Sequence, residues 1–334
     1  MNRFLPVLLL WLIFHQAVSQ TKVVTLEDIW LKPAFAASSV DAYHPLPDGE
    51  SYVQFENIAD QKTQNLSIYN YATGKQSRVL VSGAELDEKL KQAKGQADLD
   101  GLIWNTTSTK FLVPTDVEPI YRHSNVADHF VYDIASKKLT QLSAGGKQQE
   151  PTFSPDGNKV AFVRGNNLFV KNLETGVETQ ITRDGERNKI INGIPDWVYE
   201  EEFSFSRAFE WSPDSRRVAW IRFDETEVPE YTIQYFTGLY PDNYTYKYPK
   251  VGEKNSTVSV WMQDVSSLSE SGASTNPVKA DLGSGEFYIP RLDWTRDANK
   301  LCVTRMNRFQ NKMEFLIADA NTGKTNVIYT EENK

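Results

Sequence analysis

The sequence predicts an all-β fold, a β-propeller of four-stranded antiparallel blades, and three observations favour it. Short stretches with the alternating pattern of β-strands recur along the chain, each bounded by turn residues. The turns repeat the same chemistry, because Trp or Phe followed by Ser-Pro-Asp opens a unit and Thr-Gly marks a later hairpin. The openings also stand at the same place in each unit, as every blade of a propeller requires. A solenoid or a sandwich is the competing architecture.

The third of five units shows the pattern most clearly. Residues 153–157 (Phe-Ser-Pro-Asp-Gly) form its opening turn, and strands are expected at 159–164, 168–173 and 177–182. The other units open near residues 46, 104, 211 and 294, and the one at 104 is the weakest. Their spacing is uneven, so excursions are expected to leave the blades at 114–125, 183–205 and 224–257. On a scaffold of this kind, function usually lies in such departures.

Composition indicates a globular protein without a nucleic-acid partner. The chain has 334 residues, of which 40% are hydrophobic and 24% are charged. Its formal net charge is −8 and no dense Lys/Arg run occurs. A surface that binds nucleic acid would need clustered positive charge. The composition therefore excludes that class of function.

The N-terminus is typical of an export signal at residues 1–19, which leaves 20–334 as the propeller region. Arg3 precedes an apolar run at 4–14, and Ala17-Val18-Ser19 gives a small-x-small cleavage pattern. The apolar run is shorter than the roughly 20 residues that cross a bilayer. The protein is therefore expected to be exported, either periplasmic or secreted. A retained anchor is the alternative, and membrane contact is expected only in that case.

No metal site, cofactor or catalytic residue is expected in this chain. Cys302 is the only cysteine, which excludes an intrachain disulfide and a cysteine-based metal cluster. The histidines show no pair at metal-ligand spacing, and no Gly-x-Ser-x-Gly elbow occurs. Arg122-His123-Ser124 places a histidine beside a serine, but neighbours in sequence do not make a catalytic triad.

An acidic run at 196–203 (Asp-Trp-Val-Tyr-Glu-Glu-Glu-Phe) is the strongest candidate for a binding site. Pro195 and Asp196 predict a helix start there. Consecutive helical residues point about 100° apart, so two of the three glutamates could flank one point while the third faces elsewhere. An ammonium group, with three donors, suits such a pair. A solvated acidic helix start is the alternative, although the aromatic residues that flank the run disfavour it.

Four stretches together resemble the dipeptidyl peptidase IV family of exported serine peptidases. The acidic run resembles that family's hallmark, and Tyr121-Arg122-His123-Ser124 is similar to the segment that holds its substrate-facing arginine. Residues 246–255 resemble its Tyr-Pro-Lys-x-Gly-x-x-Asn stretch, and 307–311 (Asn-Arg-Phe-Gln-Asn) resemble its Asn-Arg-x-Gln-Asn turn. The resemblance covers nearly all of the mature chain, in the right order.

The resemblance implies an eight-bladed propeller that caps an α/β-hydrolase domain. Such enzymes release dipeptides from peptides whose second residue is Pro or Ala. Glu201 and Glu202 would hold the peptide's α-ammonium, and Glu200 would have no substrate role. Arg122 would contact the carbonyl of the second residue and offset the charge of the glutamates. About five of the eight blades fall within this chain, and the hydrolase domain with its Ser, Asp and His is absent from it. The chain alone is therefore expected to be inactive.

The resemblance also names partners and leaves two other functions open. The expected ligands are peptides with a free N-terminus. The 224–257 excursion resembles the arm that helps family members dimerise, so a homodimer through it is expected. One alternative function is a non-enzymatic propeller that binds peptides or protein partners. The other is a tripeptidyl relative, which shares the glutamate helix but has a deeper cavity.

Overall fold

The computed structural model describes residues 23–32, 34–37, 42–58, 63–91, 97–266 and 276–333. The chain divides into two compact units, at 1–42 and 43–334. In the first unit, the described part contains helix α2 (Leu26–Trp30), whose N-cap Thr25 forms a capping box with Asp28. The predicted signal at 1–19 lies outside the described residues. No helix of the described residues has the length and apolar character that crossing a membrane requires.

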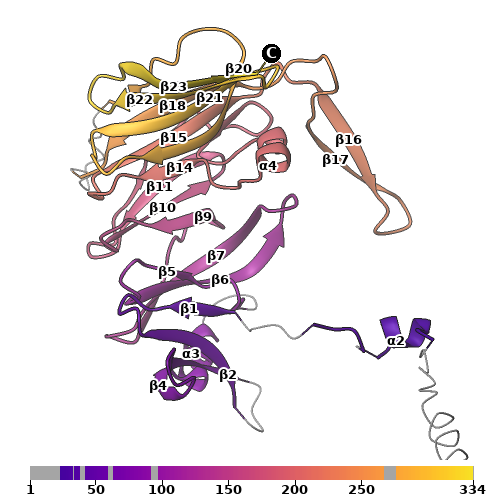
Figure 1. The fold of residues 1–334 in the computed structure, drawn as a ribbon, viewed down its shortest axis with the longest axis vertical. Coiled ribbons are helices and arrows are strands. Elements are labelled where there is room, and N and C mark those ends of the chain that lie inside the picture. The colour runs from indigo at the N-terminus through magenta and orange to yellow at the C-terminus, as the bar shows by residue number, and fades with distance from the viewer. Residues whose placement is uncertain are drawn as a thin grey trace, which may run out of the picture. The chain divides into compact units, whose positions relative to one another are not determined.

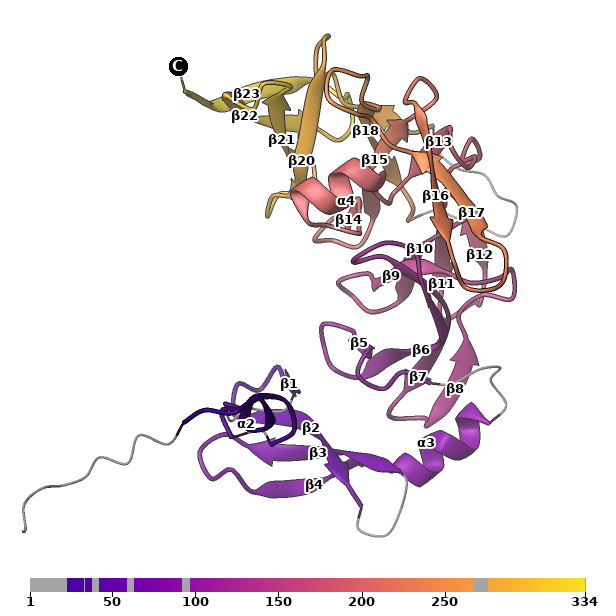
Figure 2. The same cartoon turned by 90° about the vertical axis from the view of Figure 1, so that its right-hand side faces the viewer.

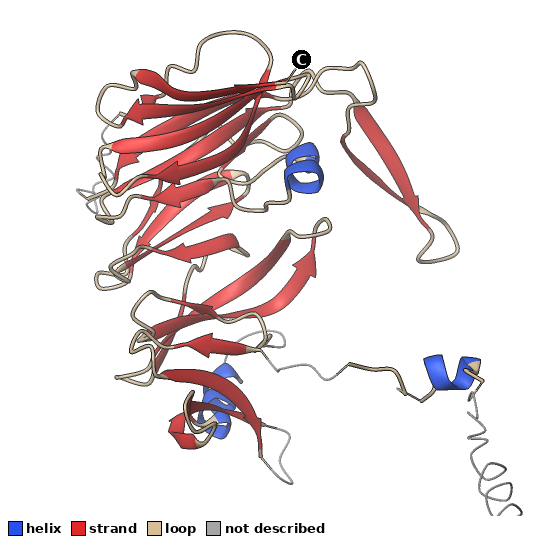
Figure 3. Ribbon diagram, in the orientation of Figure 1, coloured by secondary structure: helices blue, strands red, loops and turns tan. Residues whose placement is uncertain are grey.

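Five antiparallel sheets of four or five strands follow one another along the described part of the second unit (Figures 1 and 3). The first three sheets each have four strands that pair in chain order. They comprise β1 (Tyr43–Pro45), β2 (Ser51–Asn57), β3 (Gln64–Asn70) and β4 (Gln76–Val81); β5 (Ile103–Trp104), β6 (Lys110–Pro119), β7 (Asn125–Asp133) and β8 (Lys138–Gln141); and β9 (Gln149–Phe153), β10 (Lys159–Arg164), β11 (Asn167–Asn172) and β12 (Glu178–Gln180). Helix α3 (Gly83–Leu90) follows the first sheet.

The fourth and fifth sheets complete the series. The fourth contains β13 (Ile190–Asn192), β14 (Phe209–Trp211), β15 (Arg217–Asp224), β18 (Thr257–Asp264) and β19 (Val278–Lys279); the fifth contains β20 (Phe287–Trp294), β21 (Lys300–Asn307), β22 (Lys312–Asp319) and β23 (Thr325–Glu332). The fourth sheet has five strands instead of four, because β13 and β14 both pair with β15. The predicted all-β architecture of five successive blades is confirmed.

The Ser-Pro-Asp opening turns of the third and fourth blades have the same structural reason. Ser154 is fully buried, and its Oγ donates to Asp156 Oδ1 at 2.6 Å and accepts from Lys159 N at 2.9 Å. Ser212 makes the same pair of bonds with Asp214 and Arg217, at the same two distances. The hydroxyl therefore closes the turn that leads into β10 in the third blade and β15 in the fourth.

The tryptophans that open blades join each blade to the one before it. Trp211 Nε1 donates to the carbonyl of Thr152 at 3.1 Å, and Trp294 Nε1 donates to that of Glu210 at 3.0 Å. Thr152 lies on β9 and Glu210 on β14, so each acceptor belongs to the preceding blade. Buried aliphatic and aromatic side chains of the third, fourth and fifth sheets form one continuous core between these strands. The blades thus depend on one another for burial of their faces.

The three predicted excursions differ in kind. The excursion at 114–125 is the end of a long hairpin, because β6 continues to Pro119 and β7 begins at Asn125. The segment 183–205 contains β13 and helix α4 (Trp197–Phe203). The segment 224–257 contains β16 (Glu230–Tyr235) and β17 (Asp242–Lys247), which pair only with each other and form a separate ribbon (Figures 1 and 2). We call this ribbon the arm.

Candidate functional site

Helix α4 carries the acidic run and begins where the sequence predicts. Asp196 is its N-cap, with Oδ1 accepting from Tyr199 N at 2.9 Å, and Ser204 ends it in the left-handed conformation at φ 56°. The helix dipole favours Asp196 at the N-terminus but not Glu201 and Glu202, which lie in the last turn. These two carboxylates therefore need another source of positive charge.

The three consecutive glutamates have three different environments. Glu200 is 1% exposed, and its Oε1 accepts from the backbone N–H of both His123 and Ser124 at 2.8 Å. The side chain of Glu201 is 17% exposed and makes an ion pair with Arg122, whose Nε lies 2.8 Å from Oε2. Glu202 is exposed and has no ion pair or hydrogen bond with the residues that the structure describes. The helix thus buries Glu200, leaves Glu201 partly exposed and exposes Glu202.

Four contacts fix the helix against separate parts of the second unit. Asp196 Oδ2 accepts from Ser256 Oγ at 2.5 Å, at the return of the arm. Tyr199 Oη accepts from Ile289 N at 3.1 Å, on β20. Arg291 donates from Nη1 to the carbonyl of the last helical residue at 3.0 Å. The fourth contact is that of Glu200 with the turn between β6 and β7. The glutamates are therefore positioned by three different sheets.

A cavity of about 380 Å³ lies behind the helix and contains buried charge. Asp196, Glu200 and Glu225 line it together with Lys247. Burial raises the pKa of the Asp196 carboxyl. Burial, with a smaller contribution from the charge of Asp196, raises the pKa of Glu225 to about 7. The Oγ of Ser124 is buried against the same cavity and has no hydrogen-bond partner in the described part of the chain.

Aromatic side chains connect the base of the arm to this site. Trp197 on the helix packs on Tyr248 with ring centroids 4.3 Å apart and on Tyr246 at 6.1 Å. Tyr121, next to the arginine that pairs with Glu201, also packs on Tyr246 at 6.0 Å. Burial raises the pKa of the Tyr121 hydroxyl. Of the aromatic residues in the acidic run, Trp197 therefore packs against the base of the arm, whereas Tyr199 and Phe203 pack on each other and on Tyr288 of β20.

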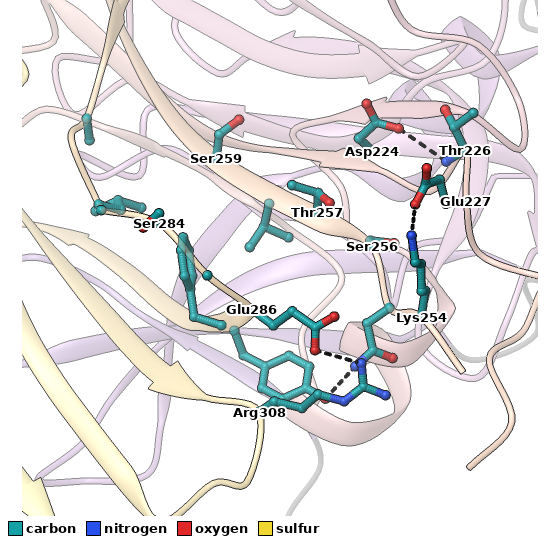
Figure 4. Close-up of a pocket in the computed structure, with 18 of the residues that line it drawn as sticks. Asp224, Thr226, Glu227, Lys254, Ser256, Thr257, Ser259, Ser284, Glu286 and Arg308 are labelled. Atoms are coloured by element: carbon teal, nitrogen blue, oxygen red, sulfur yellow. Dashed lines mark hydrogen bonds and ion pairs between the residues drawn. The ribbon is translucent and has the colours of Figure 1, made fainter. Parts of the chain in front are cut away.

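Two further motif residues, Asn255 and Arg308, line a cavity of about 710 Å³. Figure 4 shows Arg308 at this cavity. Arg308 donates to Glu286 Oε2 at 3.0 Å and to the carbonyl of Glu253. Asn255 Nδ2 donates to Tyr288 Oη at 2.6 Å. These bonds join the return of the arm to the fifth sheet, which accounts for both motifs without a ligand.

Of the predicted site residues, Arg122 and Glu201 meet directly, and the exposed Glu202 follows in the last turn of the same helix. The sequence reasoning missed the contacts made by Glu200. Its spacing contained the signal, because residues four apart share a helix face and Asp196 is the buried N-cap. Among the described ranges, no group of three or more His, Cys, Asp and Glu side chains could hold a metal ion.

Comparison with known proteins identifies the family of this chain. Residues 105–334 match the family profile described as "Dipeptidyl peptidase IV (DPP IV) N-terminal region". A probable dipeptidyl peptidase 4 of Emericella nidulans is 29% identical over 326 residues, which cover 93% of this chain and 39% of that protein. A probable dipeptidyl-aminopeptidase B of Penicillium rubens is 32% identical over 336 residues, which cover 92% of this chain and 35% of that protein.

A solved structure agrees with the curated relatives. The crystal structure of dipeptidyl peptidase 4 from Porphyromonas gingivalis is similar with a TM-score of 0.80 and 38% identity. The match covers 94% of this chain and 43% of that one. The chain therefore spans roughly two fifths of the length of the relatives it matches.

Proposed function

Because the chain belongs to the dipeptidyl peptidase IV family, we propose that it is the substrate-recognition region of an exported serine dipeptidyl aminopeptidase. The full-length protein would release X-Pro and X-Ala dipeptides from the N-terminus of peptides. In this proposal Glu201 and Glu202 bind the peptide's α-ammonium, and Arg122 offsets their charge and contacts the carbonyl of the second residue. The nucleophile would come from a part of the protein outside this chain.

The main support for the proposal is that, of two adjacent glutamates in the last turn of α4, Glu201 has an ion pair and Glu202 has none among the described residues. Two neighbouring carboxylates repel each other, and the Arg122 guanidinium 2.8 Å from Glu201 offsets that repulsion before a ligand arrives. Glu202 keeps its acceptor capacity, since no described residue pairs with it. An ammonium group has three donors and no acceptor, so it can bond to both carboxylates at once.

This arrangement gives a physical reason for exopeptidase specificity. An acylated N-terminus has no positive charge and one donor at most, so it cannot replace the ammonium between two carboxylates. Binding of the charged terminus at a fixed place also fixes how many residues separate it from the reacting carbonyl. The contacts of α4 with the β6–β7 turn, with Ser256 and with β20 would keep the bound α-ammonium at a fixed distance from the reacting carbonyl.

We further propose that a second copy of this chain binds the arm. Phe236, Leu239 and Tyr240 near its tip are 76%, 93% and 81% exposed. Exposed apolar side chains gathered in this way are typical of a protein interface. Aromatic contacts at the base of the arm would hold it at a fixed angle to the site in each copy.

Substitution of each glutamate in the full-length protein tests the proposal. Glu201→Gln and Glu202→Gln should each lower kcat/KM for a Gly-Pro amide by about 10²-fold or more, because a charge-assisted pair is lost. Glu227→Gln is the matched control, since Glu227 is an exposed glutamate that pairs with Lys254. Unchanged turnover in both site variants would exclude the ammonium assignment. Binding of free-N-terminus peptides without cleavage would instead indicate a non-enzymatic propeller.

A further inference from the structure

The glutamate without an assigned role, Glu200, is the most buried of the three consecutive glutamates. Its carboxylate is 1% exposed and accepts two backbone N–H bonds of 2.8 Å, from His123 and Ser124. These donors lie in the turn between β6 and β7, in a blade other than the one to which α4 is connected in sequence. Glu200 therefore holds together two segments that are 76 residues apart.

We propose that Glu200 is a positioning residue that sets where Arg122 meets Glu201. The two backbone donors follow Arg122 directly in the chain, and Glu201 follows Glu200 directly on the helix. The β6–β7 turn and helix α4 thus meet at two neighbouring contacts. Glu200 accepts from the backbone of His123, and the residues next to them, Glu201 and Arg122, form the ion pair. The inference rests on the proposed function only for its effect on peptide binding.

The ion pair between Arg122 and Glu201 is too weak to fix the position of the β6–β7 turn by itself. The side chain of Arg122 is 71% exposed, and an exposed ion pair contributes little because solvent screens it and two long side chains must be ordered. A buried carboxylate that accepts two backbone donors is far more directional, and leaving those donors without an acceptor carries a desolvation cost. The buried contact therefore determines the position of the turn, and the exposed pair follows it.

A neighbouring carboxylate provides the matched comparison. Glu225 is also buried and lines the same cavity as Glu200, but the backbone donors of the turn go to Glu200. Replacing either glutamate removes a buried carboxyl group from the cavity. Only replacement of Glu200 by an apolar residue removes the acceptor of the turn. A difference between the two variants is therefore due to the hydrogen bonds and not to charge alone.

Hydrogen exchange on the 334-residue chain tests the first half of the proposal. Glu200→Ala should speed exchange of the His123 and Ser124 amides by about 10- to 100-fold, while amides of the third sheet stay protected. Glu200→Gln retains an acceptor oxygen and should keep most of the protection, as should Glu225→Gln. Unchanged exchange at these two amides in Glu200→Ala would overturn the proposal. Loss of protection throughout all five sheets in Glu200→Ala would show a general structural role for Glu200 and would also contradict the proposal. If Glu200→Ala fails to fold, Glu200→Gln still tests the proposal, because it retains an acceptor oxygen.

A double-mutant cycle in the full-length protein tests the second half. Glu200→Ala should raise KM for a Gly-Pro amide more than it lowers kcat, and Glu200→Gln should restore most of KM. In an Arg122→Ala background, Glu200→Ala should have little further effect, because the two residues act through one contact. The proposal would be contradicted if Glu200→Ala raised KM by the same factor in the wild type and in the Arg122→Ala background. If Arg122→Ala alone leaves KM unchanged, the proposed function fails, while the exchange experiment still decides whether Glu200 holds the turn.

Discussion

Replacement of Glu225 by Gln should change how the stability of this protein depends on pH. Glu225 is buried beside Asp196, and its pKa is raised from 4.5 to about 7. Lys247 and Arg187 face it and lower the pKa by a smaller amount than burial raises it. In the unfolded chain Glu225 ionises near 4.5, so between pH 4.5 and about 7 the folded state binds more protons than the unfolded state. Its contribution to the free energy of unfolding therefore falls as pH rises through that window.

The size of the effect follows from the two pKa values. A difference of one pKa unit between the folded and unfolded states corresponds to about 1.4 kcal/mol. Above pH 7, ionisation of Glu225 therefore lowers the free energy of unfolding by at most about 3 kcal/mol. Glu225→Gln has no such charge to bury. At pH 8 the variant should therefore be more stable than the wild type by up to about 3 kcal/mol, and at pH 4.5 the two should agree within about 0.5 kcal/mol.

Urea unfolding of both proteins at pH 4.5, 6 and 8, at one ionic strength, measures this difference. Other titrations occur in the same range, including His129, whose pKa burial lowers to about 4. They are common to both proteins and cancel in the comparison. A difference that is the same at all three pH values would refute the assignment of the raised pKa to Glu225. A variant that is less stable at pH 8 would show that the ionised carboxylate stabilises the fold through Lys247.

Three further changes have defined outcomes. Tyr199→Phe leaves the buried amide of Ile289 without an acceptor and should lower the free energy of unfolding by about 1–3 kcal/mol in urea; unchanged stability would contradict that contact. Trp294→Phe removes a bond between blades and should cost more in urea unfolding than Trp261→Phe, whose indole bonds within its own strand. Leu239→Asp should shift the full-length protein from dimer to monomer by light scattering, and an unchanged mass would exclude the arm tip as the dimer contact.

The blades were predictable because their signals are local. Each opening serine and aspartate bonds within its own turn, so the chemistry is visible in a few consecutive residues. The long β6–β7 hairpin was not predicted, since Pro114 and Pro119 interrupt the alternating pattern and usually end a strand. Strand β13 was missed as well, because its three residues are defined by their pairing with β15 and not by their own pattern.

The site was predictable in part. The helix start at Asp196 and the divergence of three consecutive glutamates follow from helix geometry. The partner of Glu200 could not be predicted, because it is backbone N–H, which every residue except proline carries. The pairing of Arg122 with Glu201 joins segments 79 residues apart and was expected only through the family resemblance.

The most direct measurement compares two substrates of the full-length protein that differ only at the N-terminus. The account predicts rapid hydrolysis of a Gly-Pro amide with a free α-ammonium and a loss of most of kcat/KM when that amine is acetylated. In Glu201→Gln and Glu202→Gln, the preference for the free amine should shrink, since the charge that it recognises is reduced. Equal cleavage of the free and acetylated substrates by the wild type would contradict recognition of the N-terminus by the glutamates of α4.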